Sequence, residues 1–80
     1  MGRRYPPLEY RDIRTILTRL GFIKQPRKAT SHEQWINNVE GRLYKVTVSR
    51  HRGAYGHELI ASMAKQAGVS KRQFYAALFD

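Results

Sequence analysis

The sequence predicts an α+β fold of order α-β-β-β-α-α, in which helices pack on one face of a three-stranded antiparallel sheet. Apolar residues recur at helical spacing in residues 8–20 and 57–67, whereas residues 43–48 alternate with the period of a strand. A turn-rich segment before residue 43 predicts a hairpin, whose strands are antiparallel. With 80 residues, the chain is expected to form one domain spanning 1–80.

An amphipathic helix over Leu8–Leu20 is the first predicted element. Its apolar residues form one stripe, with arginines between them: Ile13, Ile16, Leu17 and Leu20. Residues 1–7 form a basic tail that we expect to be loosely ordered, because Pro6-Pro7 stops the helix from extending backwards. Gly21 supplies the left-handed residue that commonly ends a helix, and Phe22 folds back onto the last turn.

Three strands are predicted in the central part of the chain. Residues 22–28 form an edge strand, because Pro26 cannot donate a hydrogen bond to a central ladder. A second strand covers 31–37, and the segment 37–42 carries turn chemistry before the third strand at 43–48. The second and third strands therefore form a hairpin.

The alternation of the third strand separates a core face from an outward face. The side chains assigned to the core are Tyr44, Val46 and Val48. The side chains assigned to the outward face are Leu43, Lys45 and Thr47. One face of the sheet is then left uncovered, together with the basic, glycine-containing loop 49–56.

Two helices are predicted after this loop. The first covers 57–67, with Gly68 at its end and Val69 as the hydrophobic partner of its last turn. The second opens with the capping-box spacing of Ser70 and Gln73. Its residues expected to cover the core are Phe74, Tyr75, Leu78 and Phe79.

The charge balance favours a polyanionic partner. The chain has 15 Lys and Arg against 6 Asp and Glu, a formal net charge of +9, and such an excess most often serves to bind nucleic acid. It has no cysteine, which excludes disulfides and thiolate metal sites. The N-terminus lacks the apolar run of a signal peptide, and no window approaches the roughly 20 apolar residues of a membrane span. We therefore expect a soluble cytoplasmic protein with no membrane partner.

Basic residues concentrate in the central segment. They are Lys24, Arg27, Lys28, Arg42, Lys45, Arg50 and Arg52. We interpret them as a phosphate-contacting surface, the alternative being an ordinary solvated charged face. Trp35 and Tyr44, on the same strands, either pack in the core or stack on a splayed RNA base, and the scarcity of large apolar residues favours the core.

Ser31-His32 opens the second strand and is the candidate for chemistry. Because histidine titrates near neutral pH, His32 is able to act as a general base or acid. Spacing alone is a weak signal, because no acidic residue stands at a distance diagnostic of a serine-histidine nucleophile pair. On an ideal strand His32 shares a face with Gln34 and Ile36, so it is partly buried if Ile36 points into the core.

Four segments of the sequence occur in an order and spacing typical of one family. They are Leu20-Gly21-Phe22, Ser31-His32 with Trp35 following, Lys45-Val46-Thr47-Val48, and Lys65-Gln66-Ala67-Gly68-Val69-Ser70 leading to Phe74. Over nearly its whole length, the chain resembles the HicA toxins of bacterial toxin-antitoxin pairs, also called YcfA-like proteins. The resemblance implies a fold similar to a double-stranded-RNA-binding domain, an mRNA-cleaving activity, a catalytic histidine at His32, and a cognate HicB-like antitoxin that covers the site.

The resulting hypothesis is a metal-independent endoribonuclease toxin, an mRNA interferase that uses no cofactor and is a monomer when free. Breaking RNA in this way needs groups that move protons and cations that stabilise the charged phosphorane. His32 is the catalytic candidate, as general base or acid. The RNA-binding candidates are Lys28, Ser31, Lys45, Arg50 and His51.

Alternatives remain open for the other histidines and for the function. His51 either transfers the second proton or is one more exposed polar residue, and His57, at a helix start where a cation is disfavoured, is expected to be structural. A zinc site built from the three histidines matches no compact ligand spacing. A non-catalytic RNA- or DNA-binding module would use the same basic face without needing His32.

Overall fold

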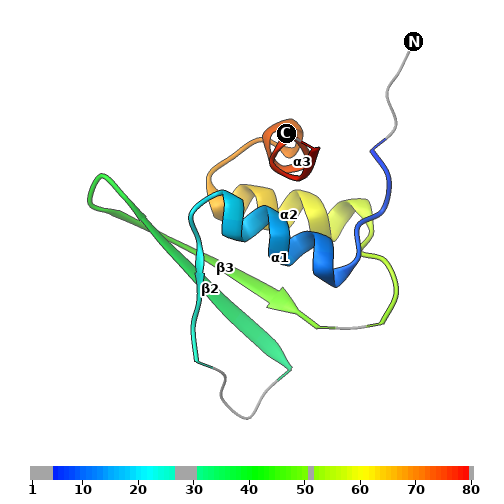
Figure 1. The fold of residues 1–80 in the computed structure, drawn as a ribbon, viewed down its shortest axis with the longest axis horizontal. Helices are drawn as coiled ribbons and strands as arrows, with labels where there is room; N and C mark the ends of the chain where they lie inside the picture. The colour runs from blue at the N-terminus through cyan, green and yellow to red at the C-terminus, as the bar shows by residue number, and fades with distance from the viewer. Residues whose placement is uncertain (1–4, 27–30, 51, 80) are drawn as a thin grey trace.

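The computed structural model describes residues 5–26, 31–50 and 52–79. Its helices and strands follow the predicted order (Figure 1). In the described residues they are α1 (Tyr10–Arg19), β1 (Ile23–Lys24), β2 (His32–Val39), β3 (Arg42–Ser49), α2 (His57–Ala67) and α3 (Lys71–Phe79). The strands form an antiparallel sheet of order β1-β2-β3, so the α+β class is confirmed. Of the described helices, none is long and apolar enough to cross a membrane.

The β2–β3 hairpin has a shorter turn than the sequence predicts. Only Glu40 and Gly41 lie between the strands, and both have positive φ angles of 52° and 83°. Two-residue turns of this kind match the right-handed twist of the strands that they join. Because the chain reverses within these residues, Asn38 and Val39 continue the ladder instead of forming part of the turn.

β1 is an edge strand, as predicted, but it is shorter than the predicted strand. Phe22 belongs to the end of α1 instead, because its N–H donates to Leu17 O at 2.9 Å and its side chain is buried. Beyond β1, the Gln25 N–H still donates to Gln34 O at 2.8 Å. Pro26 follows, and it has no N–H with which to continue the ladder.

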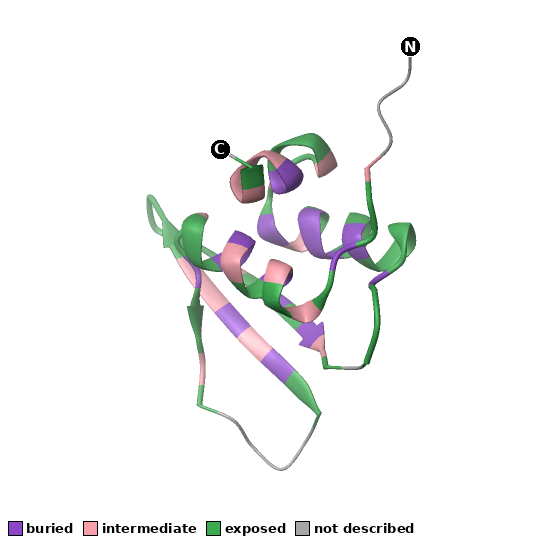
Figure 2. Ribbon diagram, turned by 45° about the vertical axis from the view of Figure 1, so that its right-hand side comes forward, coloured by how far each residue is buried: buried purple, intermediate pink, exposed green. Residues whose placement is uncertain are grey.

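The two faces of the sheet differ in what covers them. Buried and intermediate residues alternate along β2 (Figure 2). Trp35 and Val46 are partners in the register and are both buried in the core between the sheet and the helices. Val48 is buried and Tyr44 is partly buried on the same face, which confirms the predicted core face of this strand and the core interpretation of Trp35. The opposite face carries exposed side chains on β3, namely Leu43, Lys45 and Thr47.

β3 is the second edge of the sheet, and α2 lies beside it. The backbone N–H of Thr47 points away from β2 and donates to Gln66 Oε1 of α2 at 2.9 Å. Gln66 Nε2 in turn donates to Ser62 Oγ at 3.1 Å. A side chain of α2 therefore completes the hydrogen bonding of an edge strand at this position.

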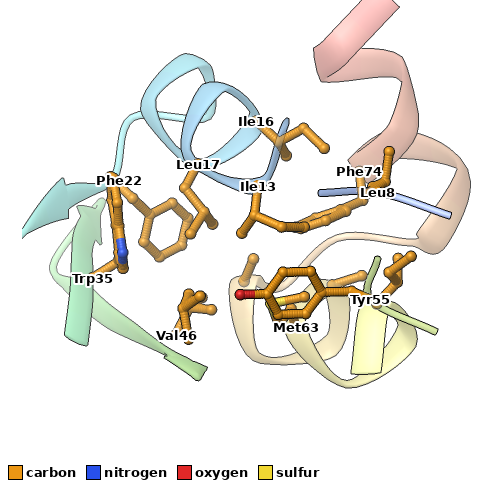
Figure 3. Packing of buried hydrophobic residues seen from close by; sticks show 14 of the residues in the cluster. Leu8, Ile13, Ile16, Leu17, Phe22, Trp35, Val46, Tyr55, Met63 and Phe74 are labelled. Carbon is orange, nitrogen blue, oxygen red and sulfur yellow. The ribbon is translucent and has the colours of Figure 1, made fainter. Parts of the chain in front are cut away.

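Side chains from α1, α2 and the sheet meet in one core (Figure 3). Its members include Ile13, Leu17, Phe22, Trp35, Val46, Tyr55 and Met63. α1 begins at Tyr10 rather than at Leu8, because Leu8 forms an isolated β-bridge with Tyr55 whose N–H donates to Leu8 O at 2.7 Å. The Glu9 N–H donates to Asp12 Oδ2 at 2.9 Å and caps the helix.

The ends of α2 and α3 follow the sequence closely. Gly68 after α2 has φ +79°, and the Val69 N–H donates to Ala64 O at 3.0 Å, which closes the last turn. At the start of α3, the Ser70 N–H donates to Gln73 Oε1 at 2.8 Å and the Gln73 N–H donates to Ser70 Oγ at 3.0 Å. The predicted capping box is thus confirmed.

All three helices lie on one side of the sheet, but α3 packs on α1 and α2, on their side away from the sheet (Figure 1). Arg19 Nη1 holds the end of α3 by donating to Ala77 O at 3.1 Å and Leu78 O at 2.8 Å. Phe74 and Tyr75 are buried as predicted. Phe79 is 68% exposed, so its predicted core role is wrong, because it lies in the last turn, beyond the buried residues of α3.

Candidate nucleic-acid interface

His32 is the first residue of β2 and is exposed on the open face of the sheet. Its partner in the register is Ser49, the last residue of β3. The alternation of β2 turns Glu33 and Trp35 toward the helices, where both are buried. Ile36 therefore lies on the side of His32 and does not draw it into the core. The histidine occupies a strand end without supporting the core.

Ser31 and Arg50 lie at the same end of the hairpin as His32. The Arg50 N–H donates to Ser31 O at 3.2 Å and continues the ladder beyond β2 and β3. The Arg50 side chain follows the parity of Val48 and turns toward the helices. Its Cζ lies 4.8 Å from the centroid of the Tyr10 ring, at the start of α1.

Lys45 shares the open face with His32 but lies farther along the hairpin. It pairs with Ile36, four residues from His32 along β2, which is a separation of about 13 Å at the rise of a strand. Lys45 and His32 therefore lie at separate points along the open face of the sheet and do not form one cluster. Lys28 and His51, the other predicted RNA contacts, lie outside the described residues.

Glu33 is a residue of this region that the sequence analysis missed. Among the described residues it is the one charged side chain that is buried, with 2% exposure. Its Oε2 accepts a hydrogen bond from the Tyr10 hydroxyl, and its Oε1 accepts one from Trp35 Nε1 at 3.2 Å. Two cations approach Oε2, with Lys24 Nζ at 3.6 Å and Arg50 Nε at 3.9 Å. We call these residues the Glu33 cluster.

The sequence contained a signal for this cluster. If His32 points outward from a strand, then Glu33 must point inward, because successive side chains alternate between faces. A carboxylate that points into a core requires hydrogen bonds or cations to offset its lost hydration. The alternation therefore predicts that Glu33 has partners, although it does not tell which residues they are.

The electrostatics of the Glu33 cluster keep its carboxylate ionised. Burial by itself raises the pKa of Glu33 and is the largest single effect, while the hydrogen bonds from Tyr10 and Trp35 lower it. The positive charges of Lys24 and Arg50 act in the same direction, so the pKa of Glu33 is lowered overall. Burial, together with the hydrogen bond to Glu33, raises the pKa of Tyr10 to about 12.

The basic residues of the central segment that the structure describes do not all lie on one face of the sheet. Lys45 is on the open face, whereas Lys24, Arg42 and Arg50 have the opposite parity. Arg42 lies over the ring of Tyr44, with Cζ 5.3 Å from the centroid. Strand alternation sends neighbouring side chains to opposite faces, so a phosphate-contacting surface that includes all of these cations stays a prediction.

His57, at the start of α2, contacts α3 rather than the hairpin. Its Nδ1 lies 2.8 Å from Lys71 Nζ, and because an ammonium group only donates, the imidazole nitrogen accepts. This contact agrees with the structural role expected for His57. Within residues 5–26, 31–50 and 52–79, no group of three His, Asp or Glu side chains gathers closely enough to hold a metal ion.

Comparison with protein families matches residues 10–69 to the model of the HicA toxin of bacterial toxin-antitoxin systems. The chain belongs to the HicA toxin family. The matched segment runs from the first residue of α1 to the residue after Gly68, so it includes the whole sheet and the Glu33 cluster. A search of the curated proteins found no match.

Membership of the HicA family identifies the protein as a toxin and implies an antitoxin partner. The match confirms the resemblance seen in the sequence. Leu20-Gly21-Phe22, Ser31-His32 and Lys45-Val46-Thr47-Val48 all lie within the matched residues. The HicA match ends before α3, the helix that lies on the other two.

Proposed function

We propose that this HicA toxin is an endoribonuclease that cleaves mRNA in the cytoplasm and that a cognate HicB-like antitoxin neutralises it. One observation carries this proposal: in a chain of a toxin family, an exposed histidine and a partly exposed arginine lie at the same end of the hairpin. These residues are His32 and Arg50. A group that transfers protons and a cation that faces phosphate are the elements that RNA cleavage requires.

The proposed reaction uses the 2′-hydroxyl of the RNA as the nucleophile. The 2′ oxygen attacks the adjacent phosphorus while a base takes its proton, and the bond to the 5′ oxygen breaks as an acid protonates the leaving group. The products are a 2′,3′-cyclic phosphate and a 5′-hydroxyl. His32 performs one of the two proton transfers. Arg50 stabilises the charged phosphorane, Lys45 contacts the backbone farther along the open face, and Ser31 orients the entrance of β2.

We propose that the antitoxin is acidic and covers the His32 end of the sheet. The toxin carries a formal net charge of +9, and complementary charge speeds the encounter of two proteins and favours the correct partner. A partner in this position shields His32 and Arg50 from RNA. The free toxin acts as a monomer in this scheme.

The decisive experiment incubates purified protein with RNA and with DNA of matched sequence, in the presence of a chelator. We expect cleavage of RNA alone, because DNA lacks the 2′-hydroxyl. Cleavage of DNA, or activity that appears only on addition of metal, would contradict the proposal. Salt-sensitive binding of nucleic acid without cleavage would instead favour a non-catalytic binding module.

A first prediction concerns His32 itself. His32→Ala should lower the single-turnover cleavage rate on the order of 10²–10⁴-fold, the range of general acid-base catalysis, while RNA affinity changes far less. The fold should persist, because His32 is exposed. Thermal stability, RNA affinity and cleavage are measured on the same preparation, with His57→Ala as the matched control that keeps the parent rate. A folded His32→Ala protein that cuts RNA at the parent rate would refute the assignment.

A further inference from the structure

The residue that follows the candidate catalytic histidine is a buried carboxylate, and its burial has to be explained. Glu33 is 2% exposed and lies opposite Val48, on the face that also buries Trp35 and Val46. Desolvating an ion in such a position is costly, and apolar residues of similar size in place of buried ionic groups often leave a protein equally or more stable. Fold stability alone therefore does not account for a glutamate at this position.

The partners of Glu33 connect four parts of the molecule. They are Tyr10 at the start of α1, Lys24 at the end of β1, Trp35 in β2, and Arg50 just after β3. The end of the hairpin that carries His32 is thus tied to the first helix and to the edge strand through one carboxylate. The hydrogen bond from the Arg50 N–H to Ser31 O fixes the backbone on the other side of His32.

The two cations of the cluster are held on one side and open on the other. The side chains of Lys24 and Arg50 are 36% and 46% exposed, although each approaches the same carboxylate oxygen. The ring of Tyr10 supports the Arg50 guanidinium. A cation already held in one direction loses less conformational entropy on meeting a phosphate than a mobile one does.

We propose that Glu33 is a positioning residue of the RNA-cleavage site proposed above. It fixes the orientation of His32 at the start of β2, and it holds the side chains of Arg50 and Lys24 so that they face RNA phosphates. Lys24 thereby joins the RNA-contacting residues. Glu33 does not touch RNA, because its side chain is fully covered. Its effect on the reaction passes through its neighbours.

The charge of Glu33 allows positioning to be separated from binding. Without that negative charge, the region around Lys24 and Arg50 becomes more positive, and this gain offsets the greater mobility of the two cations, so RNA affinity should stay equal or increase. The rate of cleavage should fall nonetheless, because His32 is held less firmly. A residue with a purely structural role would lower activity only as far as it lowers the folded fraction.

The test uses Glu33→Gln, which keeps the size of the side chain and an acceptor for the Tyr10 hydroxyl. We expect a folded protein with equal or tighter RNA affinity and a single-turnover rate lower by roughly 10- to 100-fold, the cost of a small displacement of a reacting group. A folded Glu33→Gln protein with the parent rate would overturn the inference. If this variant does not fold, Tyr10→Phe is tested in its place. It retains the Glu33 carboxylate, so we expect a smaller loss of cleavage rate. A Tyr10→Phe protein that cuts RNA at the parent rate would then overturn the inference.

A measurement without RNA distinguishes this inference from the proposed function. Position 10 is remote in sequence from His32 and His57. In Tyr10→Phe we expect the chemical shifts of the His32 imidazole to change and those of the His57 imidazole to remain the same. Unchanged His32 signals would overturn the positioning role of Glu33. A parent protein that fails to cleave RNA would instead refute the proposed function, whatever the NMR spectra show.

Discussion

At the scale of single residues, the contact between Tyr10 and the buried carboxylate of Glu33 places two shifted pKa values side by side, so stability depends on pH in two directions. The pKa of Glu33 is lowered from 4.5, so its contribution to stability is present above that value and is lost as the pH falls through the lower pKa of the folded state. The pKa of Tyr10 is raised from 10.0 to about 12. Its contribution is present below pH 10 and is lost as the pH rises toward 12.

We therefore predict that Glu33→Gln and Tyr10→Phe change opposite limbs of the profile of stability against pH. Glu33→Gln should flatten the loss of stability on the acid side, and Tyr10→Phe should reduce the loss between pH 10 and 12. Some alkaline loss should remain in Tyr10→Phe, because burial also raises the pKa of Tyr75. Denaturant unfolding as a function of pH measures both limbs, and profiles parallel to that of the parent protein would contradict the prediction.

At the scale of the elements, α2 ends directly against β3. A Cβ atom on Gly68 would clash with Cε2 of the Tyr44 ring and would lie 3.0 Å from its Cδ2. The backbone of Gly68, with φ +79°, is in addition strained for residues that carry a side chain. Gly53 has a similar φ of +84°, but it has open space around its Cβ position. Substitutions at Gly53 and Gly68 therefore separate the cost of backbone strain from the cost of crowding between α2 and β3.

Gly53→Ala should cost about 1–2 kcal/mol in the free energy of unfolding, from the left-handed conformation alone. Gly68→Ala should cost about 1–3 kcal/mol more, because the tyrosine ring has to move as well. Chemical denaturation of both variants at one pH gives the difference. Equal costs would show that the Tyr44 ring adapts freely and that the junction of α2 and β3 is not tightly packed.

The elements also show which features a sequence can predict. The bounds of α2 were predicted correctly because its stripe and Gly68 are close together in the chain. The predicted edge strand began one residue too early, because Phe22, which was also predicted to fold onto the last turn of α1, is bonded to that turn and buried in the core. For the site, strand alternation is enough to place His32 and Glu33 on opposite faces, although the sequence analysis did not draw this conclusion for Glu33. The partner Tyr10 required the position of α1 relative to the sheet, which no local pattern contains.

At the scale of the whole molecule, the positive charge predicts salt-dependent binding of RNA. Affinity should fall steeply as salt rises, because Lys and Arg release counterions from the phosphates. Lys45→Ala should lower the slope of log affinity against log salt by about 1, the value for one phosphate contact. Lys65, exposed on α2, is the matched control, and Lys65→Ala should leave the slope nearly unchanged. Equal effects of both variants would point to the net charge rather than to the open face.

The hydrogen bond between Gln66 and the edge of β3 also bears on self-association. An exposed edge strand is a template on which another chain can add a strand and begin to aggregate. At Thr47 the outward N–H is already occupied by Gln66 Oε1, so an incoming strand would have to displace the side chain and leave its amide without that partner. At this position, the hydrogen bond from the Thr47 N–H to Gln66 therefore opposes the edge-to-edge pairing of sheets through which the toxin would polymerise.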